Sequence, residues 1–292
     1  MARETRVADL VNWHGKLHDL RDAQRCRAPK FLLPFHFVTM ALLLKEEGAG
    51  AVTISPHMEE YAARLKLWEA IGLVSPPVTS EPETSSRYHE ITPLKDEQAV
   101  QTSATALADM LTGGGKHGTK AQREDISIMI SELLGNCYHH ARAHDGFHGL
   151  ACAQTWYNDT RAQFAIADTG IGIRQSLNES PDLRPQLRKR NACEYACELG
   201  VSSKLGRGHA GYGLAIARDI AMQTPNSLLY VQSLNEVYYV ENQKEAEIDS
   251  LEHALDGTLI VFEWDLKRPL DLAKVYASWP GNDDDDDTEG FF

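Results

Sequence analysis

The chain has 292 residues, of which 42% are hydrophobic and 24% are charged, and its formal net charge at pH 7 is −13. This composition excludes a disordered or fibrous protein and is typical of a soluble globular one. Six acidic residues belong to the run Asp283–Asp287 and to Glu289, so the rest of the chain carries a net charge of about −7. An acidic surface disfavours nucleic acid as a direct ligand, because phosphate contacts require clustered Lys and Arg.

Cysteine usage and hydropathy indicate the compartment. The five cysteines are Cys26, Cys137, Cys152, Cys193 and Cys197. They are too few for a disulfide framework, and the N-terminus lacks the pattern of a signal peptide. The longest apolar run, residues 31–44, is shorter than the roughly 20 residues that span a bilayer. We therefore expect a cytoplasmic protein without membrane contact, and we interpret the Cys193 and Cys197 pair as packing residues rather than metal ligands.

The first third of the chain predicts a small α/β module over residues 1–98. Its expected elements are helices at residues 5–24, 34–47 and from 56, strands near 31 and at 51–55, and an extended segment at 87–94. A helix at 96–111 then leads into a run of glycines at 112–118. We interpret residues 99–118 as a helix and a Gly-rich linker between two domains.

A second domain is predicted over residues 119–272, beginning with a long amphipathic helix at about 121–142. The extended runs that follow are residues 149–157, 161–167, 227–232, 236–242 and 258–266. A glycine-rich loop at 206–213 precedes a helix at 214–222. Residues 273–292 are expected to form a disordered acidic tail, for which a solubilising role is favoured over partner binding.

The long helix carries a polar stripe. Glu132, Asn136 and His140 recur at every fourth position, which places them on one face beside the apolar one. Gly135 is a poor residue for a helix interior, so a requirement other than helix stability is indicated there. A solvated helix face would give the same spacing, and the stripe alone leaves both interpretations open.

Two glycine-containing turns add to this stripe. Asp168, Gly170 and Gly172 directly follow a strand, where an acidic side chain and permissive turns can contact a ligand. The glycines of residues 206–213 stand before a helix, so that backbone N–H groups and the helix N-terminus can face a phosphate. No Gly-Lys-Ser/Thr follows, so this loop is not a Walker loop.

The order of these motifs, with Gly257-Thr258 opening a late strand, resembles the ATP-binding domain shared by DNA gyrase, heat-shock chaperone ATPases, histidine kinases and mismatch-repair proteins, the GHKL superfamily. The resemblance covers about residues 100–270. It implies a Bergerat-type α/β sandwich, with a mixed sheet and helices on one face, that binds ATP and Mg²⁺.

The resemblance also implies roles for individual residues. Asp168 would accept a hydrogen bond from the adenine amino group, with Thr258 assisting through water, and Asn136 would hold Mg²⁺ against the phosphates. Backbone and side chains of the turn, the stripe and the loop would complete the nucleotide site. These further positions are His140, Gly170, Gly172, Ile173, Gly208, His209, Ala210, Gly211, Tyr212, Gly213 and Leu214.

A lid is the third feature that the resemblance implies. Residues 174–207 would form a mobile segment over the site. Lys204 and Arg207 lie where a closing lid could bring positive charge to the phosphates. Closure would couple the nucleotide state to the binding of a partner protein.

Glu132 bears on the kind of activity. Sensor histidine kinases usually have Asn at this position, whereas hydrolysing members and anti-sigma-factor serine kinases have Glu, and a carboxylate there can act as general base toward water or a hydroxyl. The motif looks closest to the anti-sigma-factor kinases, because gyrase and chaperone members usually have Asp where this chain has His139. An ATPase or a serine/threonine protein kinase is implied. A non-catalytic ATP-dependent switch and a subunit of a bacterial defence complex are the alternatives.

The N-terminal region carries a second resemblance. Leu33-Pro34 before an apolar helix, and the later run Tyr61–Gly72, look like the STAS-like segments found beside such ATPase domains. STAS domains are phosphorylatable antagonists of anti-sigma factors, but no acceptor Ser is present at residues 32–35. The likeness implies a module that docks a partner or senses a ligand, with an α/β module of no inherited role as the alternative. A STAS-like or other regulatory protein is the expected partner, and a homodimer is an open alternative.

One further motif is treated as structural. His89-Glu-Ile-Thr-Pro93 resembles the phosphoacceptor box of histidine kinases, but it is one residue short between His and Pro. The segment also reads as extended rather than helical. We therefore expect a structural strand here and not an autophosphorylation site.

Overall fold

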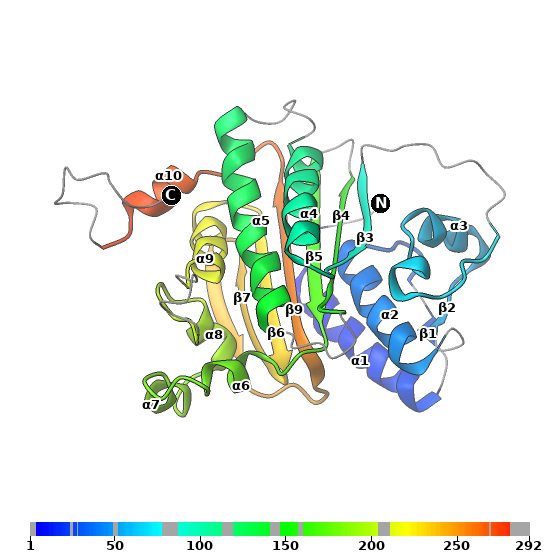
Figure 1. Ribbon diagram of the computed structural model, residues 1–292, viewed down its shortest axis with the longest axis horizontal. Helices are drawn as coiled ribbons and strands as arrows, with labels where there is room; N and C mark the ends of the chain where they lie inside the picture. The colour runs from blue at the N-terminus through cyan, green and yellow to red at the C-terminus, as the bar shows by residue number, and fades with distance from the viewer. Residues whose placement is uncertain are drawn as a thin grey trace.

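The computed structural model describes residues 4–23, 26–27, 29–48, 52–77, 87–112, 119–140, 147–156, 160–203, 211–268 and 270–280. Its helices are α1 (Val7–Ala23), α2 (Pro34–Glu47), α3 (Pro56–Arg64), the 3-10 turn η2 (Glu69–Ile71), α4 (Glu97–Leu111), α5 (Lys120–His140), α6 (Ile173–Leu177), α7 (Arg184–Leu187), α8 (Ala192–Ala196), α9 (Gly213–Gln223) and α10 (Leu272–Ala277). Its strands are β1 (Cys26–Arg27), β2 (Val52–Thr53), β3 (Tyr88–Pro93), β4 (Leu150–Trp156), β5 (Arg161–Asp168), β6 (Leu228–Leu234), β7 (Glu236–Glu241), β8 (Lys244–Ile248) and β9 (Leu255–Asp265). Figure 1 presents their arrangement.

Seven strands form one sheet in the order β3-β4-β5-β9-β6-β7-β8, and β1 and β2 form a separate parallel pair. Every pairing within the seven-stranded sheet is antiparallel, so the expectation of a mixed sheet is wrong for the described residues. The physical reason is that β9 returns between β5 and β6 and runs against both of its neighbours. The molecule is nevertheless an α/β protein, as the sequence predicts.

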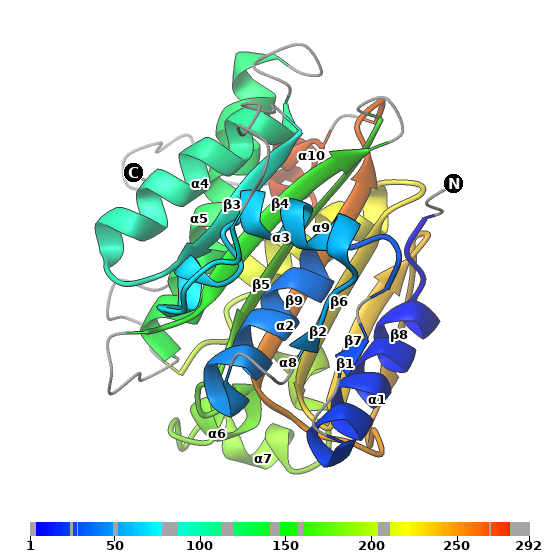
Figure 2. The ribbon, with the colours of Figure 1, turned by 90° about the vertical axis from the view of Figure 1, so that its right-hand side faces the viewer.

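Helices cover both faces of this sheet, whereas we expected them on one face. In Figures 1 and 2, α4, α5 and α9 lie on one side of the sheet and α1, α2 and α3 lie on the other. The central strand β5 explains this arrangement because it is apolar on both faces: Phe164 and Ile166 pack in the core with α4, α5 and α9, and Ala165 and Ala167 pack in the core with α1 and α2. A strand that is buried on both faces requires a layer on each.

The N-terminal helices pack directly on the large sheet. Residues Pro34 to Leu44 of α2 are all buried, and α2 lies against β4 and β5. The prediction of this helix is confirmed from Pro34 to Glu47, and Gly48 follows its end with a φ of 91°. Strand β3, which belongs to the region 1–98, is an edge strand of the sheet and pairs with β4. The N-terminal region and the sheet therefore share one apolar core.

Several local expectations require correction. Residues 31–33 are not a strand and lead directly into α2. Strand β8 was not predicted, because its exposed, charge-rich sequence offers no apolar face. Helix α10 lies inside the region assigned to the acidic tail, so the expected start of that tail at residue 273 is too early. The glycine run at 113–118 and residues 281–292 lie outside the described part of the chain.

His89 lies in β3, as the strand prediction requires. Its ring Nε2 is 3.2 Å from the hydroxyl of Thr92, and its backbone carbonyl lies 3.6 Å from the Sγ of Cys152. Burial lowers the pKa of its imidazole, with a smaller opposing effect from Glu90. The His89 side chain is partly buried on the edge strand of the sheet. These contacts are those expected of a structural residue.

A buried polar network joins the chain's beginning to the sheet. The Arg161 guanidinium donates to the Glu263 carboxylate at 2.5 Å, and the side-chain amide of Gln163 donates to the same carboxylate at 2.8 Å. The backbone N–H of Thr5 donates to Glu263 at 3.1 Å, and that of Phe35 donates to the Gln163 carbonyl at 3.3 Å. Because Glu263 is fully buried, these donors supply the stabilisation that water would otherwise give its charge.

We predict that Glu263→Gln lowers the free energy of unfolding by about 3–5 kcal/mol, because it leaves the buried Arg161 charge with only the more distant and exposed Glu4 as counter-ion. Urea denaturation followed by circular dichroism measures this. The control is Glu90→Gln, which removes an ion pair with Lys66 whose side chains are 53% and 45% exposed, and should change stability by only about 0–1 kcal/mol. Equal losses in the two variants would contradict the assignment.

Candidate functional site

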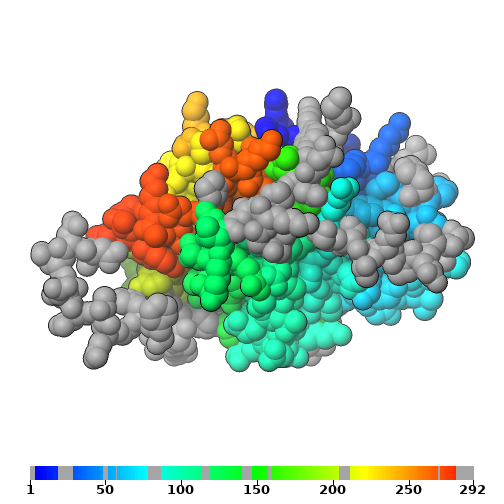
Figure 3. All heavy atoms as spheres, turned by 90° about the horizontal axis from the view of Figure 1, so that it is seen from above, coloured from blue at the N-terminus to red at the C-terminus, as the bar shows by residue number. Residues whose placement is uncertain are grey.

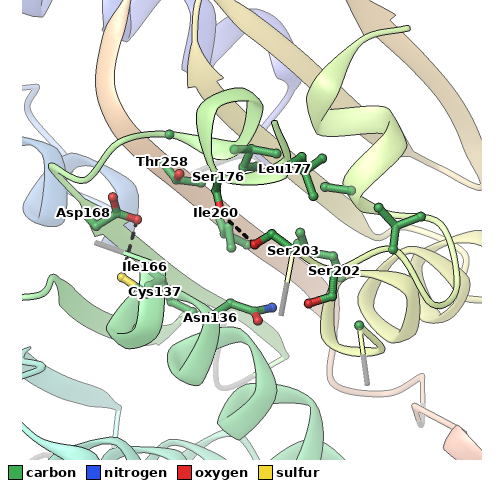
Figure 4. Close-up of a pocket in the computed structure, with 16 residues that line it drawn as sticks. Asn136, Cys137, Ile166, Asp168, Ser176, Leu177, Ser202, Ser203, Thr258 and Ile260 are labelled. Carbon is green, nitrogen blue, oxygen red and sulfur yellow. Dashed lines mark hydrogen bonds between the residues drawn. The ribbon is translucent and has the colours of Figure 1, made fainter. Parts of the chain in front are cut away.

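A pocket lies where α5, the C-terminal end of β5, the start of β9 and the first turns of α6 and α9 meet (Figure 4). It is a partly open pocket with both polar and apolar side chains in its walls. Its lining residues are Asn136, Cys137, Ile166, Asp168, Gly172, Ile173, Ser176, Leu177, Ala196, Val201, Ser202, Ser203, Gly211, Leu214, Thr258 and Ile260. Seven of these residues were predicted from sequence to bind a nucleotide.

Asp168 places a buried carboxylate at the wall of this pocket. It is the last residue of β5, lies opposite Thr258 of β9 and is only 6% exposed. Its Oδ1 accepts a hydrogen bond from the Gly170 N–H at 2.7 Å, and the Cys137 thiol donates to its Oδ2 at 3.6 Å. Burial raises the pKa of Asp168 to about 7, against the opposing effect of hydrogen bonds from Gly170, Cys137 and the Thr258 backbone.

Two glycines permit the strands and α5 to approach Asp168. A Cβ on Gly257 would lie 2.0 Å from the Asp168 backbone oxygen, and the φ of Gly257 is +89°. A Cβ on Gly149 would lie 2.5 Å from the Cys137 Sγ and 3.3 Å from the Asp168 Cβ. Sequence reasoning noted Gly257 only as a strand opener and missed Gly149 and Cys137. Their role depends on strand pairing between distant segments, which no local pattern reports.

The opposite wall is built by α5. Asn136 lines the pocket and, in Figure 4, extends toward the side where Ser202 and Ser203 lie. Glu132, one turn earlier, is exposed and is not among the lining residues. A Cβ on Gly213 would lie 2.8 Å from the Glu132 Cβ and 3.2 Å from the Asn136 Nδ2. The start of α9 therefore packs directly against the predicted polar stripe, at its first two members.

The turn after β5 closes one end of the pocket. Gly172 has a φ of +75°, and a Cβ there would lie 2.8 Å from the Ser233 hydroxyl oxygen. The Ile173 N–H donates to this oxygen at 2.8 Å, which fixes the first turn of α6 to β6. Both predicted residues, Gly172 and Ile173, lie at the pocket, while Ser233 was not anticipated. Gly170 contributes its N–H to Asp168 and does not line the pocket.

The described part of the expected lid, residues 174–203, is firmly attached to the sheet. The Arg174 guanidinium donates to both oxygens of Glu236 on β7 at 2.6 and 2.5 Å, and also to the backbone carbonyls of Leu187 and Arg190. The Ser176 and Ser203 hydroxyls lie 3.2 Å apart and form the pocket's outer wall. These contacts attach α6 to the sheet at one end and to the 201–203 stretch at the other.

The remaining predicted residues divide into two groups. Gly211 and Leu214 line the pocket, and Tyr212 and Gly213 form the N-terminal end of α9. The predicted residues Lys204, Arg207, Gly208, His209 and Ala210 lie outside the described residues, as does the side chain of His140.

The cysteine pair Cys193 and Cys197 lies in the described part of the chain. Cys193 and Cys197 are both buried, and burial raises the pKa of each thiol. Among the described residues no group of three or more His, Cys, Asp or Glu side chains is arranged to hold a metal ion. The interpretation of these cysteines as packing residues is consistent with their place in the core.

Comparisons with known proteins add no identification. No family model matches the chain, and searches of curated proteins and of solved structures also find no match. Within the described chain, no helix has both the length and the apolar character needed to cross a membrane.

We predict that Gly257→Ala destabilises the protein by more than about 2 kcal/mol, because the added methyl group meets the Asp168 carbonyl and the backbone has positive φ. Chemical denaturation measures the change. The control is Gly135→Ala, at a position in α5 where a Cβ would contact nothing within 4 Å. This control should raise stability by up to about 1 kcal/mol, and a neutral Gly257→Ala would contradict the close approach.

A second prediction concerns pH. Because folding raises the pKa of Asp168 to about 7, ionisation of this group costs stability as the pH rises from about 4 to 7. Asp168→Asn removes that cost. The stability of the variant relative to wild type should therefore increase by up to roughly 1.4 kcal/mol per pH unit between pH 5 and 7 and level off above.

Thermal melts across this pH range test the relation. Asp182→Asn, which changes an exposed carboxylate, is the control and should follow the wild-type curve. A constant difference between Asp168→Asn and wild type from pH 5 to pH 8 would contradict the raised pKa.

Proposed function

We propose that this chain is a cytoplasmic Mg²⁺- and ATP-binding regulatory protein with a Bergerat-type fold of the GHKL kind. The observation that carries the proposal is the buried Asp168 carboxylate, which lies at the wall of a pocket that also contains Thr258 and Asn136. These residues come from three segments far apart in the chain. Their convergence with Gly172, Gly211 and Leu214 supports the motif order on which the resemblance rests.

The pocket fits an adenine base. Apolar side chains of Ile166, Leu177, Leu214 and Ile260 provide surfaces for a flat ring, and Asp168 provides an acceptor for an amino group. The carboxylate must be ionised to act only as an acceptor, so its pKa near 7 makes base recognition stronger above neutral pH. Guanine carries a carbonyl oxygen where adenine carries its amino group, and an ionised carboxylate repels it.

The phosphates would lie between α5 and α9. The first turn of α9 offers backbone N–H groups, and the side-chain amide of Asn136 lines the pocket beside it, with its Nδ2 nearest Gly213. Mg²⁺, held by Asn136 and the phosphates, would neutralise charge on the transferred group. Amide oxygens are suitable ligands for this ion, which in nucleotide sites is usually held by one or two protein groups together with the phosphates.

Glu132 is the proposed general base. It is exposed one helical turn before Asn136, beside Gly213 at the start of α9. Because its side chain is exposed, its carboxylate can be reached by a water molecule or a substrate hydroxyl. This placement favours ATP hydrolysis or transfer of the γ-phosphate to a Ser or Thr of a partner protein.

Regulation would use two segments that pack on the sheet, the STAS-like N-terminal region and residues 174–203. The helices of the STAS-like region pack on β4 and β5, and β5 ends at Asp168, so a partner bound to that region would act through the same strand. The segment 174–203 borders the pocket and is attached to β7 through Glu236. A partner protein is accordingly proposed to sense the nucleotide state at either surface.

We predict that the wild-type protein binds ATP with Mg²⁺ and that Asp168→Asn weakens binding at least tenfold at pH 8, because the amide presents a donor to the adenine amino group. Glu132→Gln should keep the affinity and lower turnover by about 10²–10⁴-fold. Isothermal titration and phosphate release measure the two quantities. GTP should bind more weakly than ATP to the wild-type protein.

The matched control is Glu124→Gln, which changes an exposed carboxylate on the same helix two turns before Glu132. It should alter neither quantity. Tight binding without turnover in the wild type, with or without a candidate Ser/Thr acceptor, would favour the non-catalytic switch. Failure of the wild type to bind ATP would sink the proposal.

A further inference from the structure

The stretch that contains α7 holds the densest run of cations in the chain. Residues 184–190 read Arg-Pro-Gln-Leu-Arg-Lys-Arg, which is four cations in seven positions, and no stretch of seven residues elsewhere holds more than three. The chain as a whole carries a net charge of −13. A patch of one sign on a protein of the opposite sign attracts acidic groups and repels basic ones. This run is therefore a candidate surface for an acidic segment.

Three of the four cations face solvent, and we name Arg184, Arg188 and Lys189 the α7 cations. All three side chains are exposed. The Arg184 Nε donates to the backbone carbonyl of Asn178 at 2.8 Å, which neutralises none of its charge. Within the described part of the chain, no ion pair includes any of the α7 cations. Their charges are available to a further anionic group.

The fourth cation, Arg190, belongs to the framework beneath this surface. Its guanidinium donates to Glu194 through Nε at 3.0 Å and to Glu198 at 2.6 Å. The Arg174 guanidinium donates to the backbone carbonyls of Leu187 and Arg190 at 2.6 and 2.8 Å, and the Leu187 side chain is buried. The backbone that carries the α7 cations is thus fixed to the sheet, so little order is lost on this side when a segment docks there.

Neighbouring carboxylates limit the extent of the positive surface. Glu179 and Asp182 precede α7 and are exposed. Residues 178–189 contain three cations and these two anions, which leaves a net charge of +1. The attraction is therefore greatest at the C-terminal end of α7, where Arg188 and Lys189 are adjacent.

An occupant of matching chemistry is present in the same chain. Residues 283–289 contain six carboxylates in seven positions, and no Lys or Arg follows Lys274. The described chain ends at Pro280, and its end is attached to α9. The Trp279 indole N–H donates to the Asp219 carboxylate at 2.7 Å, and the Trp279 ring centroid lies 5.3 Å from that of Tyr212. The acidic run therefore starts from a fixed point beside α9.

This starting point lies on the side of the molecule that carries α7. In Figure 1, α10, α9, α8 and α7 follow one another down the same side, and β1, within the next densest cationic run at 25–30, lies on the opposite side. Figure 3 likewise separates the red α10 from the light blue N-terminal region. An extended chain covers about 3.3–3.6 Å per residue, so the carboxylates can lie roughly 10–30 Å from Pro280. That reach is one to three helix diameters.

We propose that the α7 cations are a docking surface for this chain's own acidic C-terminal run, which bridges α9 and α7 across the outside of the segment 174–203. The two surfaces have opposite charge, and the tether supplies the run at a high effective concentration. The contact is electrostatic and solvent-exposed, so salt disperses it. It goes beyond the proposed nucleotide chemistry and does not depend on it.

The test treats the full-length protein with a carbodiimide, which joins a lysine amine to a contacting carboxylate as an amide with loss of water. Mass spectrometry of tryptic peptides should find residues 275–292 linked to Lys189. The yield should fall at least about fivefold between about 0.02 M and about 1 M salt, where the screening length is only about 3 Å. The pair Lys66 and Glu90, 2.5 Å apart on the N-terminal side, is the internal control for the reaction.

Charge variants of the surface make the assignment specific. Arg184→Gln/Arg188→Gln keeps Lys189 as the linking amine and should lower the yield at least about threefold, and Arg188→Gln alone, which breaks no hydrogen bond of the described chain, should give an intermediate yield. Lys16→Gln/Lys95→Gln removes the same charge at two exposed residues of the N-terminal region and should match the wild type. Circular dichroism checks that each variant is folded.

A variant of the acidic run supplies an independent readout. Replacement of Asp283–Asp287 by Asn should raise the rate at which an activated acetate ester modifies Lys189 by at least about twofold at low salt, because the run no longer covers this amine. The rate at Lys66 should stay unchanged.

Several outcomes would overturn the proposal. They are a missing link at low salt while Lys66 and Glu90 are joined, equal yields in Arg184→Gln/Arg188→Gln and its control, and unchanged Lys189 modification in the Asn variant. Links between differently labelled copies in a mixture of ¹⁵N-labelled and unlabelled protein would assign the occupant to a second copy and also overturn it. No readout involves a nucleotide, so this inference and the proposed function fail separately.

Discussion

The antiparallel pairing of β5 with β9 is the constraint on which the rest of the molecule depends. It joins segments about 90 to 104 residues apart and sets Asp168 opposite Thr258 at one end and Arg161 opposite Asp265 at the other. The first end forms the wall of the pocket, and the second carries the buried ion pair with Glu263. Each helix layer packs on the faces of these two central strands. The site and the fold are therefore specified by the same set of backbone hydrogen bonds.

The candidate site lowers the stability of the folded protein. A buried carboxylate costs stability when ionised, and Asp168 keeps its place through hydrogen bonds from Gly170, Thr258 and Cys137. Gly257 and Gly149 leave room for these donors to approach. Such local costs are typical of positions retained for binding or chemistry rather than for stability. The opposite is true of α2, whose apolar residues serve packing alone.

Sequence reasoning succeeds where the signal is local. The helix at Pro34–Glu47 follows from its apolar run and flanking Pro and Gly. Asp168, Asn136 and Thr258 were singled out by the order of the motifs and the resemblance it implies, and the structure brings all three to one pocket. Sequence reasoning fails where contacts depend on distant pairing. Cys137 and Gly149 gain their role only when β4 and β5 bring them beside Asp168, and the charged strand β8 lacks an apolar pattern. Helix α10 was likewise not predicted, because the acidic run that follows it led us to assign the whole region to a disordered tail.

The alternation of side chains along β5 has a consequence for how this chain can vary in length. Even-numbered residues of the strand, from Ala162 to Asp168, face α5 and the pocket, whereas Arg161 and Gln163 face the buried network near α2. Deleting or inserting one residue within the strand would turn one of its ends to the wrong layer. The alternation of side chains along β5 thus fixes both the buried Arg161 charge in the core and the Asp168 carboxylate in the site. Relatives that keep both features must confine their insertions and deletions to the connections outside β5.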